Sequence, residues 1–230
     1  MLQGKTVLEH IVNRVKSARN VDDVIVATTE RIEDSEIVQF CRDRMIKVFA
    51  GSENDVLDRF YRAALTHSFS HIIRITADCP LLDAELVDAI IHNHIKENAD
   101  YTSNVLEETF PDGEDIEIMT FEALTKAWQM ATLASEREHV TPFIRNNPAL
   151  FKLRNITSRE NLSSKRWTLD EPRDYEFIQA VYNGIYQRDN LFGMQSVLDF
   201  LKENPGIEAI NQGISRNEGY RKSLTDEKTG

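Results

Sequence analysis

Cysteine is scarce in this sequence of 230 residues, which contains only Cys41 and Cys79. The two cysteines lie far apart and form no C-x-x-C pair. This spacing argues against both a disulfide framework and a cysteine-rich zinc site. Free, isolated cysteines are typical of a reducing compartment, so we expect a cytoplasmic protein.

Long apolar runs and an excess of basic residues are also absent. No stretch approaches the ~20 apolar residues of a membrane-spanning helix, so we expect no membrane partner. The 27 Lys and Arg residues against 38 Asp and Glu residues leave a net charge of −11. Nucleic-acid polymers require stripes of Lys and Arg, so we expect no such partner. A small anionic substrate remains compatible, because a bound cation or a few basic groups can reverse the field inside one cleft.

The first hundred residues alternate between apolar strands and amphipathic helices. Short β-branched runs predict buried strands at 23–29, 46–51 and 71–77. Helical periodicity predicts helices at 5–18, 34–45, 52–68 and 83–99, with N-caps at Asp34 or Ser35, at Ser52 and at Asp83. This alternation indicates βαβ units. We therefore predict an α/β fold with a mostly parallel sheet and helices on both faces.

The second half has shorter strands and more helix. Strands are predicted at 100–105, 114–120, 151–157 and 166–170, and helices at 121–131, 135–147 (interrupted at Pro142), 171–186 and 194–205. Trp128 and Trp167 occupy patterned positions typical of core residues. We predict a single domain over residues 1–224 and a flexible tail at 225–230.

Two aspartates follow predicted strands and form the main candidate site. Asp78 comes after the strand at 71–77, and Asp170 ends the strand at 166–170. Ligands of open α/β sheets bind beyond the carboxyl ends of strands, and two carboxylates there suit Mg²⁺. Each aspartate taken alone also fits an ordinary turn former or helix cap. Asp174, in the first turn of a helix, is expected to serve the helix dipole.

A series of motifs gives the chain a resemblance to a known family. In order they are VLEHIVNRV, DDVIVATT, VFAGSENDVLDRFYRAA, RITADCPLLD, ADYTSN, TFPDGEDIEI, SEREHVTPFIR, RWTLDEPRDYEF and SRNEGYRKSL. They resemble the spore coat polysaccharide biosynthesis protein F family from about residue 2 to residue 224. That family is similar to the CMP-sugar synthetases, including those for 3-deoxy-manno-octulosonate and acylneuraminate.

The resemblance implies a Rossmann-like nucleotidyltransferase fold and cytidylyltransferase activity. A sugar hydroxyl would attack the α-phosphorus of CTP, giving a CMP-sugar and pyrophosphate. Asp78 in ADCPL matches the metal-binding Asp of the family's GDxPL pattern, and Asp170 in LDEPRD matches the second, in DTPED. Both are therefore expected to be catalytic and to bind Mg²⁺. Ala77 stands where the family usually has Gly. A homodimer is implied by the resemblance alone.

The remaining site candidates have plain structural alternatives. Asp55 and Arg59 in DVLDR are candidates for nucleotide binding, or they form an i, i+4 ion pair on a helix. Asp115 and Glu117 alternate with apolar residues along a strand, so both acids point to the same face of that strand. That face contacts either the sugar or solvent. The last sugar-binding candidates, Arg137 and His139, begin a helix, and His139 is alternatively a packed or capping residue.

One family motif is missing from the front of the sequence. Family members begin with a strand and a loop resembling QARxGSxRLPGK, which binds the triphosphate. This sequence starts at MLQGKTVLEH, matching the segment after that loop. We therefore expect the first strand to be missing from the sheet, the neighbouring strand edges to lack partners, and the chain as given to bind CTP weakly.

Three functions are compatible with these observations. The first is a CTP-dependent nucleotidyltransferase for surface or spore coat polysaccharide. The second is a glycosyltransferase that uses a nucleotide-sugar, although no D-x-D motif occurs at a strand end. The third is a degenerate, non-catalytic subunit, suggested by the missing loop.

Overall fold

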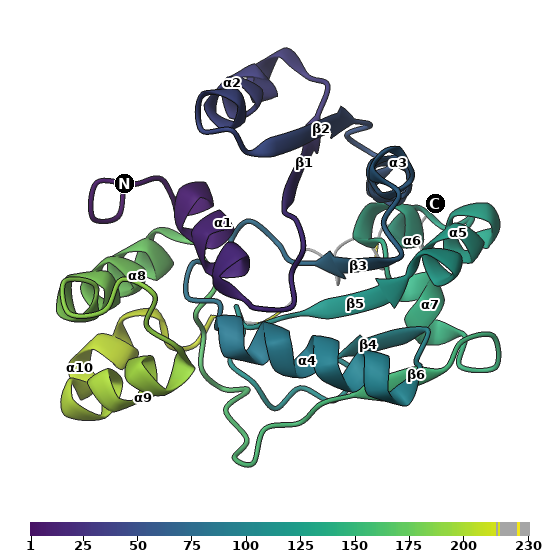
Figure 1. Ribbon diagram of the computed structural model, residues 1–230. Coiled ribbons are helices and arrows are strands. Elements are labelled where there is room, and N and C mark those ends of the chain that lie inside the picture. Colours follow the sequence, from purple (N-terminus) through teal and green to yellow (C-terminus); the bar gives the residue numbers. More distant parts are fainter. Residues whose placement is uncertain (215, 217–224, 226–230) are drawn as a thin grey trace.

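The computed structural model describes residues 1–214, 216 and 225, and Figure 1 presents its arrangement of helices around two sheets. The smaller sheet pairs β1 (Ile25–Thr29) with β2 (Lys47–Gly51) in parallel. The larger sheet has the order β3-β5-β4-β6. Its strands are β3 (His71–Arg74), β4 (Tyr101–Ser103), β5 (Glu117–Thr120) and β6 (Leu153–Asn155). The predicted α/β fold is confirmed.

The larger sheet is mixed, which corrects the prediction of a mostly parallel sheet. Strand β5 runs antiparallel to both β3 and β4, while β4 and β6 are parallel. A parallel return requires a long crossover, usually a helix. The segment between β4 and β5 contains no helix and turns back through Gly113, so β5 returns antiparallel beside β4.

The two sheets do not join. Strand β1 pairs only with β2, and β3 pairs only with β5. Within the part of the chain that the structure describes, no strand lies beside the outer edge of β1 or of β3.

The helices of the first half follow the predicted pattern closely. They are α1 (Val7–Ser17), the 3₁₀ turn η1 (Ile32–Asp34), α2 (Ser35–Asp43), α3 (Val56–His67) and α4 (Ala84–Glu97). Asp83 caps α4 by accepting a hydrogen bond from the backbone N–H of Glu85, as predicted. The cap of α3 is Asp55, not Ser52, because the Ser52 hydroxyl accepts the N–H of Asp55 and the helix begins later.

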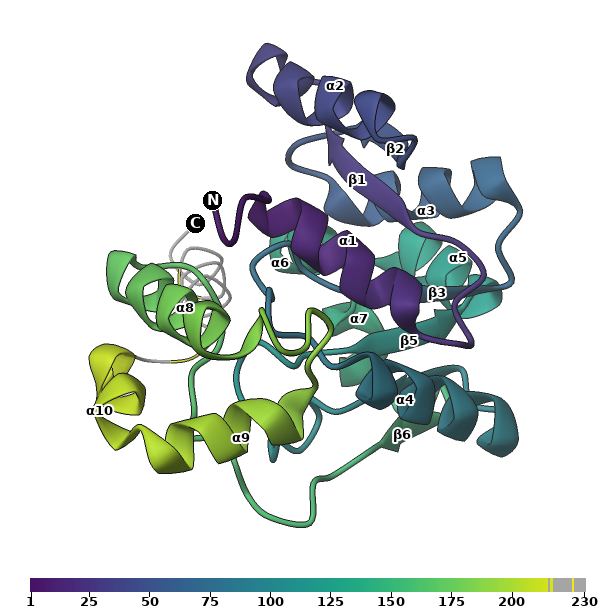
Figure 2. The same cartoon turned by 60° about the vertical axis from the view of Figure 1, so that its left-hand side comes forward.

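The helices of the second half are shorter and lie at two ends of the molecule. They are α5 (Phe121–Met130), α6 (Ala134–His139), α7 (Pro142–Asn146), α8 (Pro172–Ile185), α9 (Met194–Glu203), α10 (Pro205–Glu208) and the 3₁₀ turn η2 (Ala209–Asn211). Figure 1 shows α8, α9 and α10 on one side of α1 and α5 and α6 on the other, and Figure 2 again shows α8 and α5 on opposite sides of α1. The predicted break at Pro142 is confirmed, because α7 begins there.

Helices cover both faces of the larger sheet, as predicted. Ile72 faces Met119 across β3 and β5, and with Tyr101 they join a core that includes residues of α3 and α5. The next pair along, Ile73 and Ile118, points to the opposite face, into a core that includes residues of α1 and α4. The alternation of side chains along a strand explains this division.

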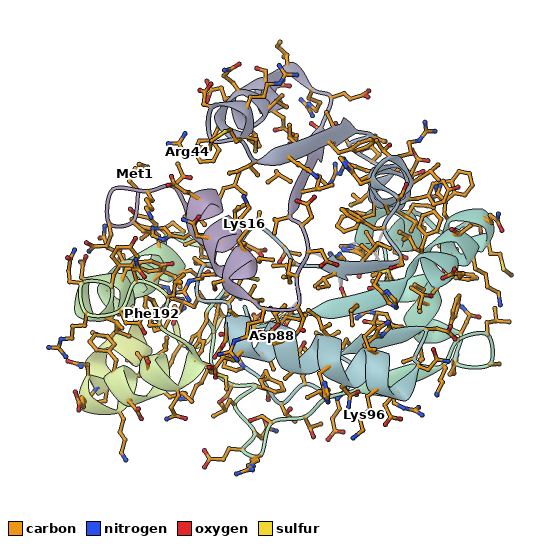
Figure 3. The ribbon with its side chains drawn as sticks, in the orientation of Figure 1. Met1, Lys16, Arg44, Asp88, Lys96 and Phe192 are labelled. Carbon is orange, nitrogen blue, oxygen red and sulfur yellow. The ribbon has the colours of Figure 1, made fainter. Side chains whose placement is uncertain are left out.

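A third core lies under α8 and α9. Trp167, which is 1% exposed, packs there with apolar residues of both helices, so the prediction that it is a core residue is confirmed. The guanidinium of the buried Arg14 donates to the carbonyl of Phe192 at 2.7 Å and ties α1 to this core. Just beyond the C-terminal end of α1, the carboxylate of Asp88, labelled in Figure 3 with Phe192, accepts the backbone N–H groups of Arg19 and Asn20.

Two further predictions concern membrane-spanning helices and the C-terminal tail. Across residues 1–214, 216 and 225, no helix is long and apolar enough to cross a membrane. The flexible tail predicted at 225–230 lies, apart from Thr225, outside the described residues.

Candidate functional site

A cleft of about 420 Å³ opens at the carboxyl end of β3 and collects most of the predicted site residues. The segment after β3, the turn before β5, the α6–α7 region and residues 166–171 form its walls. Its charged lining residues are Arg74, Asp78, Glu108, Asp112, Asp115, Glu117, His139, Arg145, Arg166, Asp170 and Glu171. Five of the eight predicted site residues therefore share one cleft.

Asp78 is held by the turn that follows β3. Its carboxylate accepts hydrogen bonds from the Thr76 hydroxyl and, at 3.2 Å, from the Cys79 thiol. Its backbone carbonyl accepts the N–H of Leu169 at 2.9 Å. That bond ties the turn carrying Asp78 to the segment carrying Asp170, so the two loops hold both aspartates at one edge of the cleft.

The segment before Asp170 is not the strand that the sequence predicts. Residues 166–170 make only an isolated bridge, between Arg166 and Asp112. The backbone N–H groups of Trp167 and Leu169 bond to the carbonyls of Asp112 and Asp78, which belong to two different loops. Because no single strand runs alongside, the β-like pattern of residues 166–170 does not become a ladder.

Arg166 connects the carboxylates around Asp170. Its side chain, 8% exposed, contacts Asp170 at 2.9 Å, Asp112 at 3.2 Å and Asp174 at 2.8 Å. Asp174 is fully buried and also accepts the backbone N–H groups of Asp170 and Glu171. Asp174 therefore serves the start of α8, as predicted, but it also anchors a buried ion pair.

The charge of Asp78 affects the ionisation of Asp170. Burial raises the pKa of Asp170, and the negative charge of Asp78 raises it further, while Arg166 opposes both effects. Mutual repulsion of this kind is relieved by a cation between the carboxylates.

The donor set fits a magnesium ion that is shared with a substrate. Mg²⁺ takes one or two protein carboxylates and fills its other positions with water and phosphate oxygens. Asp78 and Asp170 supply two such carboxylates. Among the described residues, no group of three or more His, Cys, Asp or Glu side chains is arranged to hold a metal by itself.

Gly113 fixes the turn between β4 and the cleft. Its φ of +105° lies in the region that favours glycine. A Cβ atom there would lie 2.6 Å from the backbone nitrogen of Thr168. The absence of a side chain thus lets the 111–115 turn press against the segment that carries Asp170.

Glu117 forms the far end of the cleft. Its carboxylate, 5% exposed, accepts from Arg74 at 2.7 Å, from the Tyr101 hydroxyl at 2.5 Å and from the Thr141 hydroxyl at 2.7 Å. Burial works against ionisation, but the charges of Arg74 and Arg145 and these hydrogen bonds outweigh it and lower the pKa of Glu117. Glu117 is therefore a buried anion that orders cationic groups around it.

Asp115 and His139 also line the cleft. Asp115 lies on the same side of the chain as Glu117, as the alternation predicts, and Ile116 between them is fully buried in the core. Burial raises the pKa of Asp115 to about 7, with Arg216 opposing the shift. Burial also lowers the pKa of His139, which favours the neutral imidazole.

The other three predicted site residues lie outside the cleft lining. The guanidinium of Arg137 donates hydrogen bonds from two of its nitrogens to the Asp55 carboxylate, at 3.0 and 2.6 Å. Its third nitrogen donates to the carbonyl of Trp128 at 2.7 Å. Arg59 donates to the Ser52 carbonyl at 2.9 Å, so the alternative ion pair with Asp55 does not form. Asp55 and Arg137, predicted at the nucleotide and sugar subsites, bind each other and join α3 to α6.

We expect Arg137→Ala to act on stability. The change leaves the Asp55 carboxylate without its bidentate partner, so the Tm should fall by a few degrees. Thermal unfolding measures the fall, with Arg173→Ala, an exposed arginine on α8, as the control. A Michaelis constant for the sugar that rises in Arg137→Ala while the Tm is unchanged would contradict this and favour sugar binding.

Sequence reasoning overlooked Arg166, Asp112 and Arg74. Arg166 is part of the RWTLD motif, and a basic residue four positions before a candidate metal ligand was the available signal. Asp112 stands in the PDGED turn, where an acidic residue is an ordinary turn former. Arg74 lies within the apolar strand β3. Its presence there is explained by the ion pair with Glu117, which lies opposite it on β5.

Comparisons with known proteins agree with this arrangement. The profile of the cytidylyltransferase family matches residues 1–200. An uncharacterized protein of Methanocaldococcus jannaschii is 39% identical over 226 residues, covering 96% of this chain and 89% of the relative. The spore coat polysaccharide biosynthesis protein SpsF of Bacillus subtilis is 30% identical over 211 residues, covering 89% and 86%.

A solved structure is similar over nearly the whole chain. It is a cytidylyltransferase from Leptospira borgpetersenii, with a TM-score of 0.87 and 29% identity, covering 94% of this chain and 90% of that one. The fold of this chain is therefore similar to the fold of that enzyme over nearly its whole length.

Proposed function

The chain belongs to the cytidylyltransferase family of nucleotidyltransferases, and from this premise we propose that it activates a sugar or sugar acid with CTP. A hydroxyl oxygen of the acceptor forms a bond to the α-phosphorus, and the bond from that phosphorus to the β-phosphate oxygen breaks. The products are a CMP-sugar and pyrophosphate, and the hydroxyl proton passes to solvent. The 30% identity to SpsF supports a role in surface or spore coat polysaccharide synthesis.

The observation that carries the proposal is that Asp78 and Asp170 line one cleft, on two loops that the hydrogen bond from the Leu169 N–H to the Asp78 carbonyl ties together. These two carboxylates would hold Mg²⁺, which would neutralise triphosphate charge and the charge that develops on phosphorus. Thr76 orients the Asp78 carboxylate, and Arg166 orients that of Asp170. Holding both ligands in place before substrate arrives reduces the reorganisation that the reaction requires.

The other end of the cleft supports an acceptor rich in hydroxyl groups that carries negative charge. Arg74 and Arg145 line the cleft there and both act on the buried carboxylate of Glu117, so two cations stand against one anion. Such a surplus of cationic groups suits a sugar carboxylate or phosphate. Asp112 and Asp115, nearer the metal edge, present oxygens that accept hydrogen bonds from hydroxyls.

Pyrophosphate release tests the proposal. The chain is incubated with CTP, Mg²⁺ and a panel containing 3-deoxy-manno-octulosonate, acylneuraminate and neutral hexoses, and mass spectrometry identifies the product. At CTP concentrations high enough to offset the weak binding expected from the sequence, we expect pyrophosphate and a CMP-sugar in equal amounts, with less product when UTP or ATP replaces CTP. Removal of Mg²⁺ with a chelator should stop the reaction.

Other results point to the competing functions. Consumption of a nucleotide-sugar without pyrophosphate release would favour a glycosyltransferase. The absence of both turnover and CTP binding, with binding measured by calorimetry in the presence of Mg²⁺, would favour a non-catalytic subunit.

A further inference from the structure

Arg216, in the C-terminal part of the chain, lies against the turn that carries the acids of the cleft. Its Nη2 atom contacts the Asp115 carboxylate at 2.5 Å, and its Nη1 atom donates to the Phe110 carbonyl at 3.2 Å. Its Nε atom lies 3.5 Å from Glu108 and 3.7 Å from Asp112. The Arg216 side chain is only 10% exposed.

A nearby cation stabilises the charged forms of Glu108, Asp112 and Asp115. Glu108, Asp112 and Asp115 all line the cleft, and like charges this close repel one another. Burial raises the pKa of both Asp112 and Asp115, and the charge of Arg216 opposes the rise in each case. Without Arg216, these side chains would move apart or take up protons, and their oxygens would no longer face the cleft as fixed acceptors.

Arg216 stands on the protein side of the acids, and the cleft lies on the other. Arg216 itself is not among the cleft-lining residues, whereas Ile214, two positions earlier, is. Asp112 is shared between Arg216 and Arg166, and Arg166 in turn contacts Asp170. A continuous line of alternating charges therefore runs from the C-terminal part of the chain to the metal edge.

We propose that Arg216 is a positioning residue that holds Asp112 and Asp115 toward the cleft, where their carboxylates bind hydroxyl groups of the acceptor. The inference rests on the proposed function and adds Arg216 to the groups that shape the acceptor subsite. Arg216 touches neither the acceptor nor CTP. It acts through the two aspartates, so its loss weakens acceptor binding and leaves nucleotide binding intact.

The test compares Arg216→Ala and Arg216→Lys with Arg188→Ala, a control at an exposed arginine beyond α8. The acceptor is the one that the wild-type chain uses in the pyrophosphate assay. We expect Arg216→Ala to raise the acceptor KM at least tenfold, with the Kd for CTP and Mg²⁺ changed by less than about twofold. Arg216→Lys should recover part of the loss, because lysine keeps the positive charge. The recovery should be incomplete, because lysine lacks the planar guanidinium fork. Equal rises in the acceptor KM and the CTP Kd, or an acceptor KM within threefold of wild type, would overturn the proposal.

A second measurement needs no turnover. Thermal unfolding of Arg216→Ala, Asp115→Asn and the double variant forms a cycle. If Arg216 fixes Asp115, the Tm shift of the double variant is smaller than the sum of the single shifts. Additive shifts would overturn the proposal even if the pyrophosphate assay found no acceptor, whereas a coupled cycle without turnover would count against the proposed function alone.

Discussion

Asp78→Asn is expected to lower the turnover number by on the order of 10²- to 10³-fold, the effect typical of removing one charge-stabilising group from an active site. The substitution keeps the shape of the side chain and removes its negative charge, so the proposed Mg²⁺ loses the charge of one of its two protein ligands. Asp170→Asn should have a similar effect, because both carboxylates line the same edge of the cleft. Initial rates of pyrophosphate release at saturating CTP measure the change.

The control for both variants is Asp22→Asn, which alters an exposed aspartate before β1. Its rate should equal that of the wild type. The Tm of Asp78→Asn should remain near the wild-type value, which separates lost chemistry from lost folding. A rate in Asp78→Asn within threefold of wild type would show that this carboxylate does not hold the catalytic metal.

Arg166→Met should have the largest effect on stability. The substitution leaves Asp174, which is fully buried, without its cation, and breaking one side of a buried ion pair typically costs about 3–5 kcal/mol. For a chain of this size such a loss corresponds to a fall in Tm of roughly 10 °C. Burial opposes ionisation of Asp174, yet the bonds from Arg166 and Asn211 outweigh it and lower the pKa, which agrees with a charged pair.

Two further variants check the cause of this loss. Arg173→Met, at an exposed position in the same helix as Asp174, should leave the Tm nearly unchanged. Adding Asp174→Asn to Arg166→Met should recover part of the stability, because the buried charge is then removed with its partner. If the double variant is no more stable than Arg166→Met, the ion pair is not the source of the loss.

The sequence alone determined the kinds of element and the residues that end them. Its apolar runs and helical periodicity located β1 to β6 and α1 to α9 within a few residues, because burial patterns of period two and 3.6 are local properties. It also singled out Asp78 and Asp170 at the ends of apolar segments. Both lie in one cleft in the structure.

Only the tertiary structure decided which side chains meet. Arg137 and Asp55 are 82 positions apart and bind each other, while Arg166 gathers three aspartates from two loops and a helix start. Residues 166–170 carry a strand-like pattern, yet their partners lie on two separate loops. The free energy of an ion pair depends on distance and burial, and both are set when remote segments pack together. No local pattern therefore predicts them.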